Sequence, residues 1–298
     1  MRSAAAASVL SAPPAKATRR RNPLLERWLF VYLPLLFALV FLIGPFYWMA
    51  VTALKPDGEL YDPARSPLYV TAPTLAHFRY LLFETDFLLW ARNTLLVSAC
   101  ATALALGMGV PAGYALARLR FRGSELIGTA IFVTYLVPTS LLFIPMVNVM
   151  AAFGLDDNIW ALVVVYPTFL APFVTWLMSA YFRTIPSELE DCGRIDGLTR
   201  LGAMWRIAIP LARPGILSAG IFAFTLSWNE FIYALTLVSA SSERTIPVGV
   251  LVQLSRADFY FWGPLMAGAL LGSVPVAIVY SFFVDQYASG LTAGAVKG

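Results

Sequence analysis

The chain alternates between long apolar stretches and short polar connections. Five stretches contain no Asp, Glu, Lys or Arg, and they cover residues 28–54, 93–117, 126–155, 158–182 and 259–284. About 20 apolar helical residues cross a bilayer core of about 30 Å, and each stretch is longer than that. A sixth stretch, 214–238, is also long enough but contains Glu230. The pattern predicts an all-α integral membrane protein with six transmembrane helices.

Prolines interrupt two of the predicted helices. Pro138 and Pro145 lie in the third helix, and Pro167 and Pro172 lie in the fourth. Proline at membrane depth frees backbone carbonyl groups, which is tolerated where helices pack or where a water-filled cavity is lined. These two helices therefore either border a pathway or use their kinks for packing.

Composition excludes several classes of protein. The chain is 59% hydrophobic and 13% charged, with a mean hydropathy of +0.73. Cys100 lies in an apolar stretch and Cys192 in a polar loop, so a disulfide framework is not expected. His77 is the only histidine, and the three lysines follow Ala, Leu and Val rather than the Gly of a P-loop. We expect no catalytic residue, no metal site and no cofactor on this chain. The net charge of +4 is too modest to indicate a nucleic acid partner.

The distribution of Lys and Arg predicts the orientation. Fifteen of the 21 lie before the first helix, after the second, after the fourth or at the C-terminus. Cytoplasmic loops are enriched in these residues, so both termini are expected in the cytoplasm. Residues 1–23 are predicted to be a disordered basic tail at the membrane lipid rather than a signal peptide. The six-helix domain is expected over 24–290, with an extracytoplasmic loop at 55–87 and a cytoplasmic tail at 291–298.

The connection 184–213, on the predicted cytoplasmic side, has helical patterns of its own. Ser187 and Glu190 have the spacing of a capping box, and Gly197 is a natural end for the short helix that would start there. Thr199 has the right character to cap a second short helix that ends near Pro210. Two short helices joined at a glycine indicate either a docking element for another protein or an amphipathic pair on the membrane surface.

This connection resembles the EAA loop of ABC importer permeases. Residues 188–197 read Glu-Leu-Glu-Asp-Cys-Gly-Arg-Ile-Asp-Gly, and 207–210 read Ile-Ala-Ile-Pro. The family motif is Glu-Ala-Ala, then Asp-Gly, then Ile-x-Leu-Pro. By position, Asp191 stands for its Glu and Cys192 and Gly193 for its two Ala. Ile209 stands for its Leu, while Asp196, Gly197 and Pro210 match. In that family the loop is a coupling helix seated in a cleft of an ATPase subunit. The resemblance implies nine coupling candidates: Glu188, Glu190, Asp191, Cys192, Gly193, Asp196, Gly197, Ile207 and Pro210.

Shorter matches extend the resemblance through the rest of the chain. Residues 45–48, 113–118 and 228–231 look like the carbohydrate-uptake class of these permeases, and the C-terminal residues 290–298 are similar to the tail of the smaller maltose-type subunit. The resemblance implies a type I ABC importer permease architecture in a bacterial plasma (inner) membrane. It also implies a heterodimer with a second permease subunit, two ATPase subunits that carry ATP and Mg, and an extracytoplasmic sugar-binding protein.

The expected function is import of a sugar, an oligo- or disaccharide, by alternating access. Sugar sites pair aromatic faces with hydrogen-bonding groups. The candidates at suitable depth are Tyr135, Asn148, Trp228, Asn229 and Glu230. For Glu230 two interpretations stay open: a polar group that faces the pathway with Asn229, or a structural hydrogen bond at the outer boundary.

Two alternatives to a sugar importer remain. A permease of the same class could carry another solute, such as a polyol or a glycerol phosphate derivative, although a phosphate would ask for Arg or Lys in the pathway. A proton-coupled secondary transporter would need ionisable residues deep in several helices, and only Glu230 and Asp285 qualify.

Overall fold

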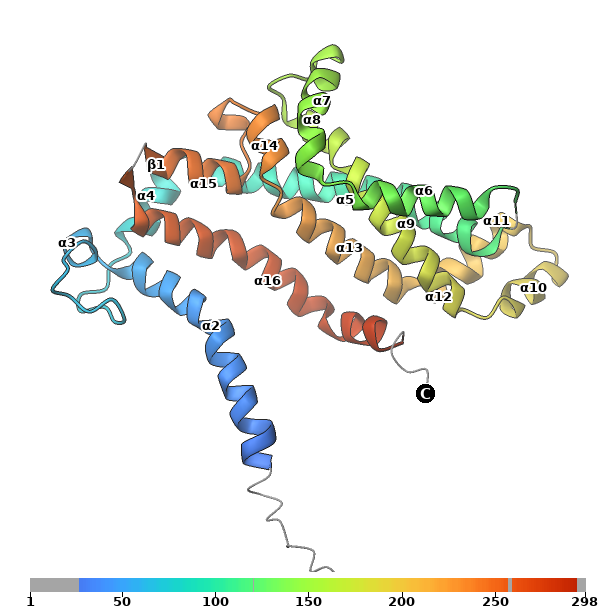
Figure 1. Ribbon diagram of the computed structural model, residues 1–298, viewed down its shortest axis with the longest axis horizontal. Coiled ribbons are helices and arrows are strands. Elements are labelled where there is room, and N and C mark those ends of the chain that lie inside the picture. The colour runs from blue at the N-terminus through green and yellow to red at the C-terminus, as the bar shows by residue number, and fades with distance from the viewer. Residues whose placement is uncertain (1–26, 120, 257–258, 294–298) are drawn as a thin grey trace, which may run out of the picture. The chain divides into compact units, whose positions relative to one another are not determined.

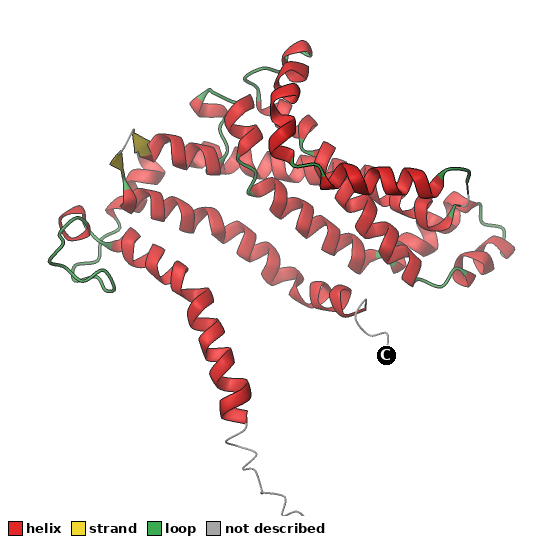
Figure 2. Ribbon diagram, viewed as in Figure 1, coloured by secondary structure: helices red, strands yellow, loops and turns green. Residues whose placement is uncertain are grey.

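The computed structural model describes residues 27–119, 121–256 and 259–293, and these residues are mostly helical (Figure 2). The tail predicted at 1–23 lies outside these ranges, as does most of the tail predicted at 291–298. The chain divides into two compact units, residues 1–47 and 48–298.

The described part of the first unit is a π-helical turn, η1 (Trp28–Tyr32), followed by most of helix α2 (Leu33–Leu54), which continues into the second unit. Its large apolar side chains are exposed, with Phe37 and Phe41 both more than 70% exposed. An all-round apolar helix of this kind is typical of a membrane span.

The second unit contains the remaining elements in a fixed order. The helices are α3 (Asp57–Leu60), α4 (Ala76–Phe83), α5 (Phe87–Arg118), α6 (Ser124–Leu136), α7 (Thr139–Ala152), α8 (Ile159–Val165), α9 (Pro167–Thr184), α10 (Glu188–Ile195), α11 (Arg200–Ala203), η2 (Met204–Ala208), α12 (Ile209–Leu211), α13 (Arg213–Trp228), α14 (Ile232–Leu237), η3 (Ser241–Glu243), α15 (Ile246–Leu254) and α16 (Trp262–Ala293). Strands β1 (Ser255–Arg256) and β2 (Phe259–Tyr260) form a small antiparallel hairpin in which Ser255 pairs with Tyr260.

Among the described residues, four helical stretches are long and apolar enough to cross a membrane: Trp28–Leu54, Phe87–Arg118, Ile159–Thr184 and Trp262–Phe283. Two bent pairs bring the number to six if each is one span. Helices α6 and α7 meet at 95°, and the stretch Arg200–Leu211 meets α13 at 75°. The first break lies at Pro138, directly before α7, where the sequence predicts an interruption.

The predicted fifth helix is not continuous. Helix α13 ends at Trp228 and α14 begins at Ile232, so the expectation that Glu230 lies within one long helix is wrong. The apolar pattern does not reveal this break, because Asn229 and Glu230 are its only strongly polar positions.

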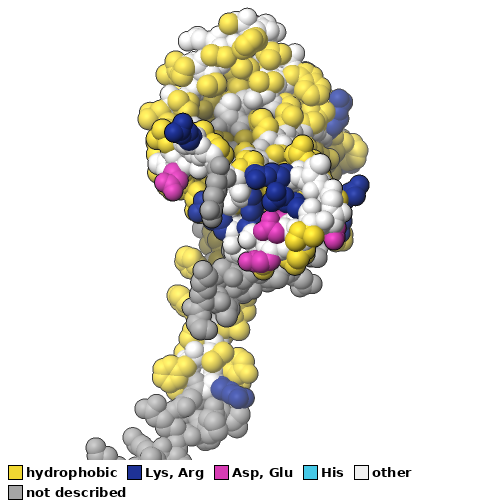
Figure 3. All heavy atoms as spheres, turned by 90° about the vertical axis from the view of Figure 1, so that its right-hand side faces the viewer, with side chains coloured by type: hydrophobic (Ala, Val, Ile, Leu, Met, Phe, Trp, Pro, Cys, Tyr) yellow, Lys and Arg dark blue, Asp and Glu magenta, His cyan; other side chains and the backbone are white. Residues whose placement is uncertain are grey.

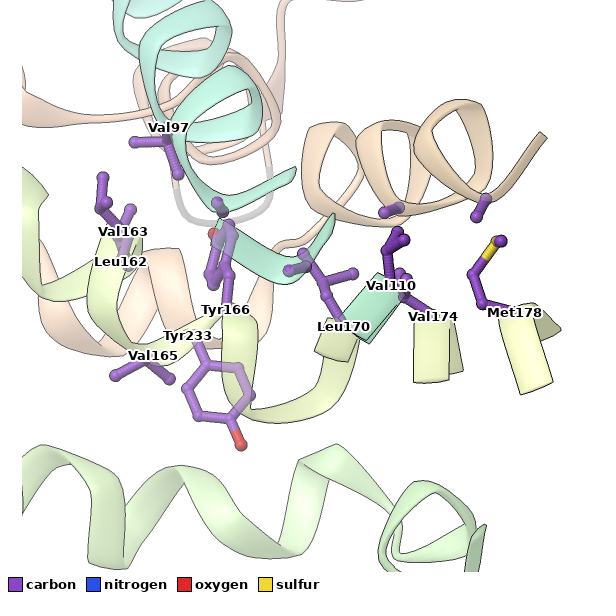
Figure 4. Close-up of a cluster of buried hydrophobic side chains, with 14 of the residues drawn as sticks. Val97, Val110, Leu162, Val163, Val165, Tyr166, Leu170, Val174, Met178 and Tyr233 are labelled. Carbon is purple, nitrogen blue, oxygen red and sulfur yellow. The ribbon is translucent and has the colours of Figure 1, made fainter. Parts of the chain in front are cut away.

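The core of the second unit is built on the close packing of α5 against α9 (Figure 1). Side chains of α5 such as Val97 and Val110 join Leu170, Val174 and Met178 of α9 in a buried cluster (Figure 4). Helix α13 contacts both α5 and α9, and on its other side it contacts α16. The glycines in the second predicted helix serve this packing, since Gly109 and Gly113 both face α9.

The predicted extracytoplasmic segment 55–87 is held by polar contacts. The carboxylate of the buried Glu59 accepts hydrogen bonds from the backbone N–H of Thr71, at 2.9 Å, and of Ala72, at 3.3 Å. The bond from Thr71 is the main reason why the pKa of Glu59 lies below its ordinary value. The buried His77 ring contacts the carbonyl oxygen of Lys55 at 2.7 Å, which ties α4 to the end of α2.

Candidate functional site

The connection 184–213 folds into two helical pieces at the end of the second unit farthest from α4 and the β hairpin (Figure 1). The first piece is α10, and the second is the run α11, η2 and α12. The position of both pieces at the ends of α9 and α13 follows from the chain itself, because these helices deliver and remove it.

Gly197 ends α10 as the sequence predicts. Its φ of +92° lies in the left-handed region that favours glycine. The N–H of Gly197 donates to the carbonyl of Arg194 at 3.1 Å, and the N–H of Leu198 donates to the carbonyl of Gly193 at 3.0 Å. These two bonds form a Schellman motif, which satisfies carbonyl groups that a helix end leaves open.

The capping box predicted at the start of α10 is not formed. Ser187 has helical backbone angles and makes no side-chain cap. The carboxylate of Glu190 instead accepts hydrogen bonds from the phenol of Tyr114, at 2.6 Å, and from Nε of Arg118, at 2.8 Å. Hydrogen bonds between ionised partners are stronger than the neutral bond that a capping box offers, so α5 wins this side chain.

The second helical piece is capped and attached as predicted from its residues. The hydroxyl of Thr199 accepts from the N–H of Gly202 at 3.1 Å, the N-cap expected for α11. Gly193 of α10 faces Ile207 of η2 so closely that a Cβ built on Gly193 would overlap with Cδ1 of Ile207. The two helical pieces are therefore in direct contact at these two motif positions.

Burial divides the nine coupling candidates into two groups. Glu190 and Gly193 are buried, and Ile207 and Pro210 are half-buried, so these four attach the loop to the bundle. The exposed group comprises Glu188, Asp191, Cys192, Asp196 and Gly197.

Large apolar side chains lie exposed among these polar residues. Ile195 of α10 is 86% exposed, and Leu201 and Trp205 of the second piece are 68% and 62% exposed. Acidic and basic side chains gather on the same end face (Figure 3). A mixed apolar and charged surface on a firmly attached loop suits the docking of another protein.

Two of the substrate-pathway candidates are engaged in packing. Trp228 is 3% exposed, and its Nε1 donates to the carbonyl of Gly272 at 3.0 Å. Glu230 accepts from the hydroxyl of Tyr166 at 2.8 Å and from the N–H groups of Tyr233 and Ala234 at 2.9 and 3.1 Å. These contacts make Glu230 the cap of α14.

The other three candidates are exposed. Asn229 lies next to Glu230 at the break, and its side chain donates to the carbonyl of Thr225 at 2.9 Å. Tyr135 of α6 packs its ring 5.6 Å from that of Phe173, and Asn148 lies on α7. The five candidates do not gather around one ring-sized site.

A cavity of about 500 Å³ lies elsewhere, between α5, α6 and α9. Its lining includes Glu125, Thr129, Trp176, Ser179 and Arg183, none of which the sequence analysis selected. Across the described ranges, no group of three His, Cys, Asp or Glu side chains is arranged to hold a metal ion.

Sequence reasoning missed the part that Tyr114 and Arg118 play in this site. Both lie in the motif 113–118, which entered only as a resemblance. A usable signal was present, because Arg118 is a charge at the end of a long apolar helix with no acidic residue nearby in sequence. Its partner, Glu190, lies 72 positions away.

Comparisons with known proteins were made on sequence and on structure. Residues 109–293 match the model of the family described as binding-protein-dependent transport system inner membrane component. The chain is 37% identical over 257 residues to the sulfoquinovosyl glycerol transport system permease protein SmoH of Agrobacterium fabrum, which covers 85% of this chain and 88% of that one.

Two further comparisons agree. The trehalose transport system permease protein SugB of Mycobacterium tuberculosis is 34% identical over 257 residues, covering 85% of this chain and 92% of that one. A chain in the crystal structure of a bacterial ABC transporter involved in the import of the acidic polysaccharide alginate superposes with a TM-score of 0.74. That alignment covers 93% of this chain and 99% of the other at 22% identity, so it shows a shared fold.

Proposed function

The chain belongs to the family of binding-protein-dependent transport system inner membrane components, and on this premise we propose that it is one permease subunit of an ATP-driven sugar importer. The chain is a multi-pass membrane protein with the fold of an ABC importer permease. It is the transport subunit and not the enzyme: hydrolysis of ATP, with its Mg, takes place on separate ATPase subunits.

The observation that carries the proposal is the surface of the 184–213 connection. Ile195, Leu201 and Trp205 are exposed there, while Glu190 and Gly193 attach the same connection to the helix bundle. A subunit that receives the energy of ATP from a partner needs a surface of this kind, apolar enough to bind and stiff enough to transmit movement. We assign the ATPase contact to this surface, with Asp191 and Cys192 at its centre.

The other partners follow from the family. A second permease subunit would complete the channel, and an extracytoplasmic binding protein would deliver the solute on the opposite side. The exposed apolar faces of α6 and α7 support a protein or lipid contact there. We place the 184–213 connection and both termini in the cytoplasm of a bacterial cell, because five Arg lie in or next to this connection: Arg183, Arg194, Arg200, Arg206 and Arg213.

The proposed substrate is a sugar or a glycoside. The relatives named for sulfoquinovosyl glycerol and trehalose cover most of this chain at more than 30% identity. Translocation proceeds by alternating access, in which the breaks at Pro138 and at Asn229 serve as places where helices change direction. Tyr135, Asn148 and Asn229, which are exposed, are the candidates that remain available to a passing solute.

The test is transport by the assembled complex. The chain is co-expressed with its partner subunits, reconstituted in proteoliposomes, and supplied with ATP, the binding protein and a panel of solutes that includes disaccharides, acidic glycosides, a polyol and a glycerol phosphate. ATP-dependent uptake of one sugar supports the proposal. Uptake driven by a proton gradient without any ATPase subunit would overturn it, and uptake of the polyol or phosphate alone would replace the sugar.

A matched pair of variants tests the docking surface. Ile195→Asp places a charge on the most exposed apolar residue of α10, whereas Ile195→Val keeps its character. We expect the ATPase subunits to co-purify with the Val variant and to be lost from the Asp variant. Equal co-purification with both variants would place the ATPase contact elsewhere.

A further inference from the structure

Helix α10 carries an acidic residue whose environment differs from that of its neighbours. Glu188 and Asp191 are exposed, but Glu190 is buried, with its side chain only 8% exposed. A buried carboxylate is retained only where it is paired and hydrogen-bonded. Its partners therefore identify a contact that the helix depends on.

Those partners join three segments of the chain. Arg118, at the last residue of α5, contacts Glu190 at 2.8 Å, and its side chain is 13% exposed. The same guanidinium donates through Nη2 to the carbonyl of Ile185, just after α9, at 2.5 Å. Tyr114, one turn earlier on α5, donates its hydroxyl to the second carboxylate oxygen of Glu190 at 2.6 Å. The end of α5 thus holds both the end of α9 and the first turn of α10.

The helices on the far side of this contact form a stiff pair. The ring of Tyr114 packs edge-on against that of Phe182 in α9, with centroids 5.5 Å apart and planes at 85°. Gly113, the neighbour of Tyr114, lies directly against the backbone of α9. A displacement of Glu190 would therefore move α5 and α9 together rather than bend one of them.

We propose that Tyr114 and Arg118 are positioning residues that transmit the movement of α10 to the α5–α9 pair. This inference rests on the proposed function, since it takes α10 as the helix that the ATPase subunit moves. The division of labour is by face: the exposed face of α10 binds the partner, and the buried Glu190 on the opposite face passes the displacement on. The contact of Gly193 with Ile207 keeps the second helical piece in step with the first.

The variants remove the link without altering the exposed face. Arg118→Gln leaves the carboxylate of Glu190 buried without its cation. Tyr114→Phe removes one hydroxyl and keeps the ring that packs on Phe182. The double variant Arg118→Gln with Glu190→Gln replaces the ion pair by two neutral amides, which retain hydrogen-bonding groups at both positions. Arg183→Gln is the control, since it removes a positive charge at the end of α9 that is exposed and outside this contact.

The measurement is the number of solute molecules imported per ATP hydrolysed in proteoliposomes, with the ATPase content of each complex measured alongside. We expect Arg118→Gln to lower this ratio about fivefold or more, the lower end of typical coupling factors, while the ATPase subunits remain bound. Tyr114→Phe should lower it less, Arg183→Gln should leave it unchanged, and the double variant should recover part of the loss.

The outcomes separate this inference from the function on which it rests. If the native complex shows no ATP-driven uptake, the proposed function fails. If the native complex couples and both Arg118→Gln and Tyr114→Phe keep its ratio, the transmission through Glu190 is wrong. Loss of the ATPase subunits from Arg118→Gln together with a native ratio in Tyr114→Phe also overturns it, because the contact would then only hold α10 in place.

Discussion

Gly113 of α5 and Ser179 of α9 lie so close that a Cβ built on Gly113 would be 2.9 Å from the backbone nitrogen of Ser179. The same Cβ would lie 2.9 Å from the carbonyl oxygen of Thr175. Backbone atoms cannot rotate away as a side chain does, so the approach of these two helices depends on a residue without a side chain. This close contact makes α5 and α9 one mechanical element.

The first prediction follows from this contact. Gly113→Val should destabilise the purified subunit by about 1–3 kcal/mol, the usual cost of overpacking a close contact. Gly107→Val is the matched control, because the same helix leaves open space around Gly107. Thermal unfolding of both variants in detergent checks this, and equal midpoints would show that α5 and α9 separate at no cost.

The second prediction concerns Gly193, which stands where the resembling motif has Ala. Gly193→Ala should keep transport, since Ala gains about 1 kcal/mol of helix propensity and only the flexible end of Ile207 has to move. Gly193→Leu should separate α10 from η2 and reduce uptake strongly. Uptake assays on the two variants decide, and native uptake by Gly193→Leu would contradict the contact.

The third prediction addresses Gly197, where φ is +92°. Gly197→Val should strain the end of α10 by about 1–2 kcal/mol, the usual cost of left-handed backbone for a residue with a Cβ. Gly197→Asn should be milder, because Asn adopts this region more readily. ATP-driven uptake should fall in the order Gly, Asn, Val, and a Val variant as active as the native chain would show that the turn is not needed.

The fourth prediction distinguishes the two interpretations of Glu230. Glu230→Ala leaves the hydroxyl of the fully buried Tyr166 without its acceptor, and a buried unpaired group costs about 1–3 kcal/mol. Thermal stability should fall in Glu230→Ala and much less in Glu230→Gln, which still accepts a hydrogen bond. Native stability combined with altered solute selectivity would instead place Glu230 in the pathway.

The fifth prediction is a pH dependence on the extracytoplasmic side. Backbone hydrogen bonds, led by that from Thr71, hold the pKa of Glu59 below its ordinary value of 4.5. The stabilisation is therefore fully present above pH 4.5 and is lost as the pH falls through the lowered pKa of the folded state. Resistance of the 55–75 segment to proteolysis should fall over that range in the native chain. Glu59→Gln should not show this fall, and a parallel fall in both would assign it to other groups.

Local chemistry accounts for what the sequence by itself determined about this protein. The apolar stretches indicate the spans because a helix must match the bilayer thickness, and Pro138 marks the break in the third because proline disrupts a helix wherever it lies. Gly197 and Thr199 mark helix ends because caps involve residues at most a few positions apart. The family resemblance likewise depends on short motifs.

Only the tertiary structure decided which residues those local elements meet. Glu190 gives up its expected capping box for Tyr114 and Arg118, which lie 76 and 72 positions away. Glu230 similarly caps a new helix and binds Tyr166, 64 positions away, where the apolar pattern indicates one continuous span. Such pairings depend on how α5, α9 and α13 pack, and a buried charge takes the strongest partner that packing brings within reach.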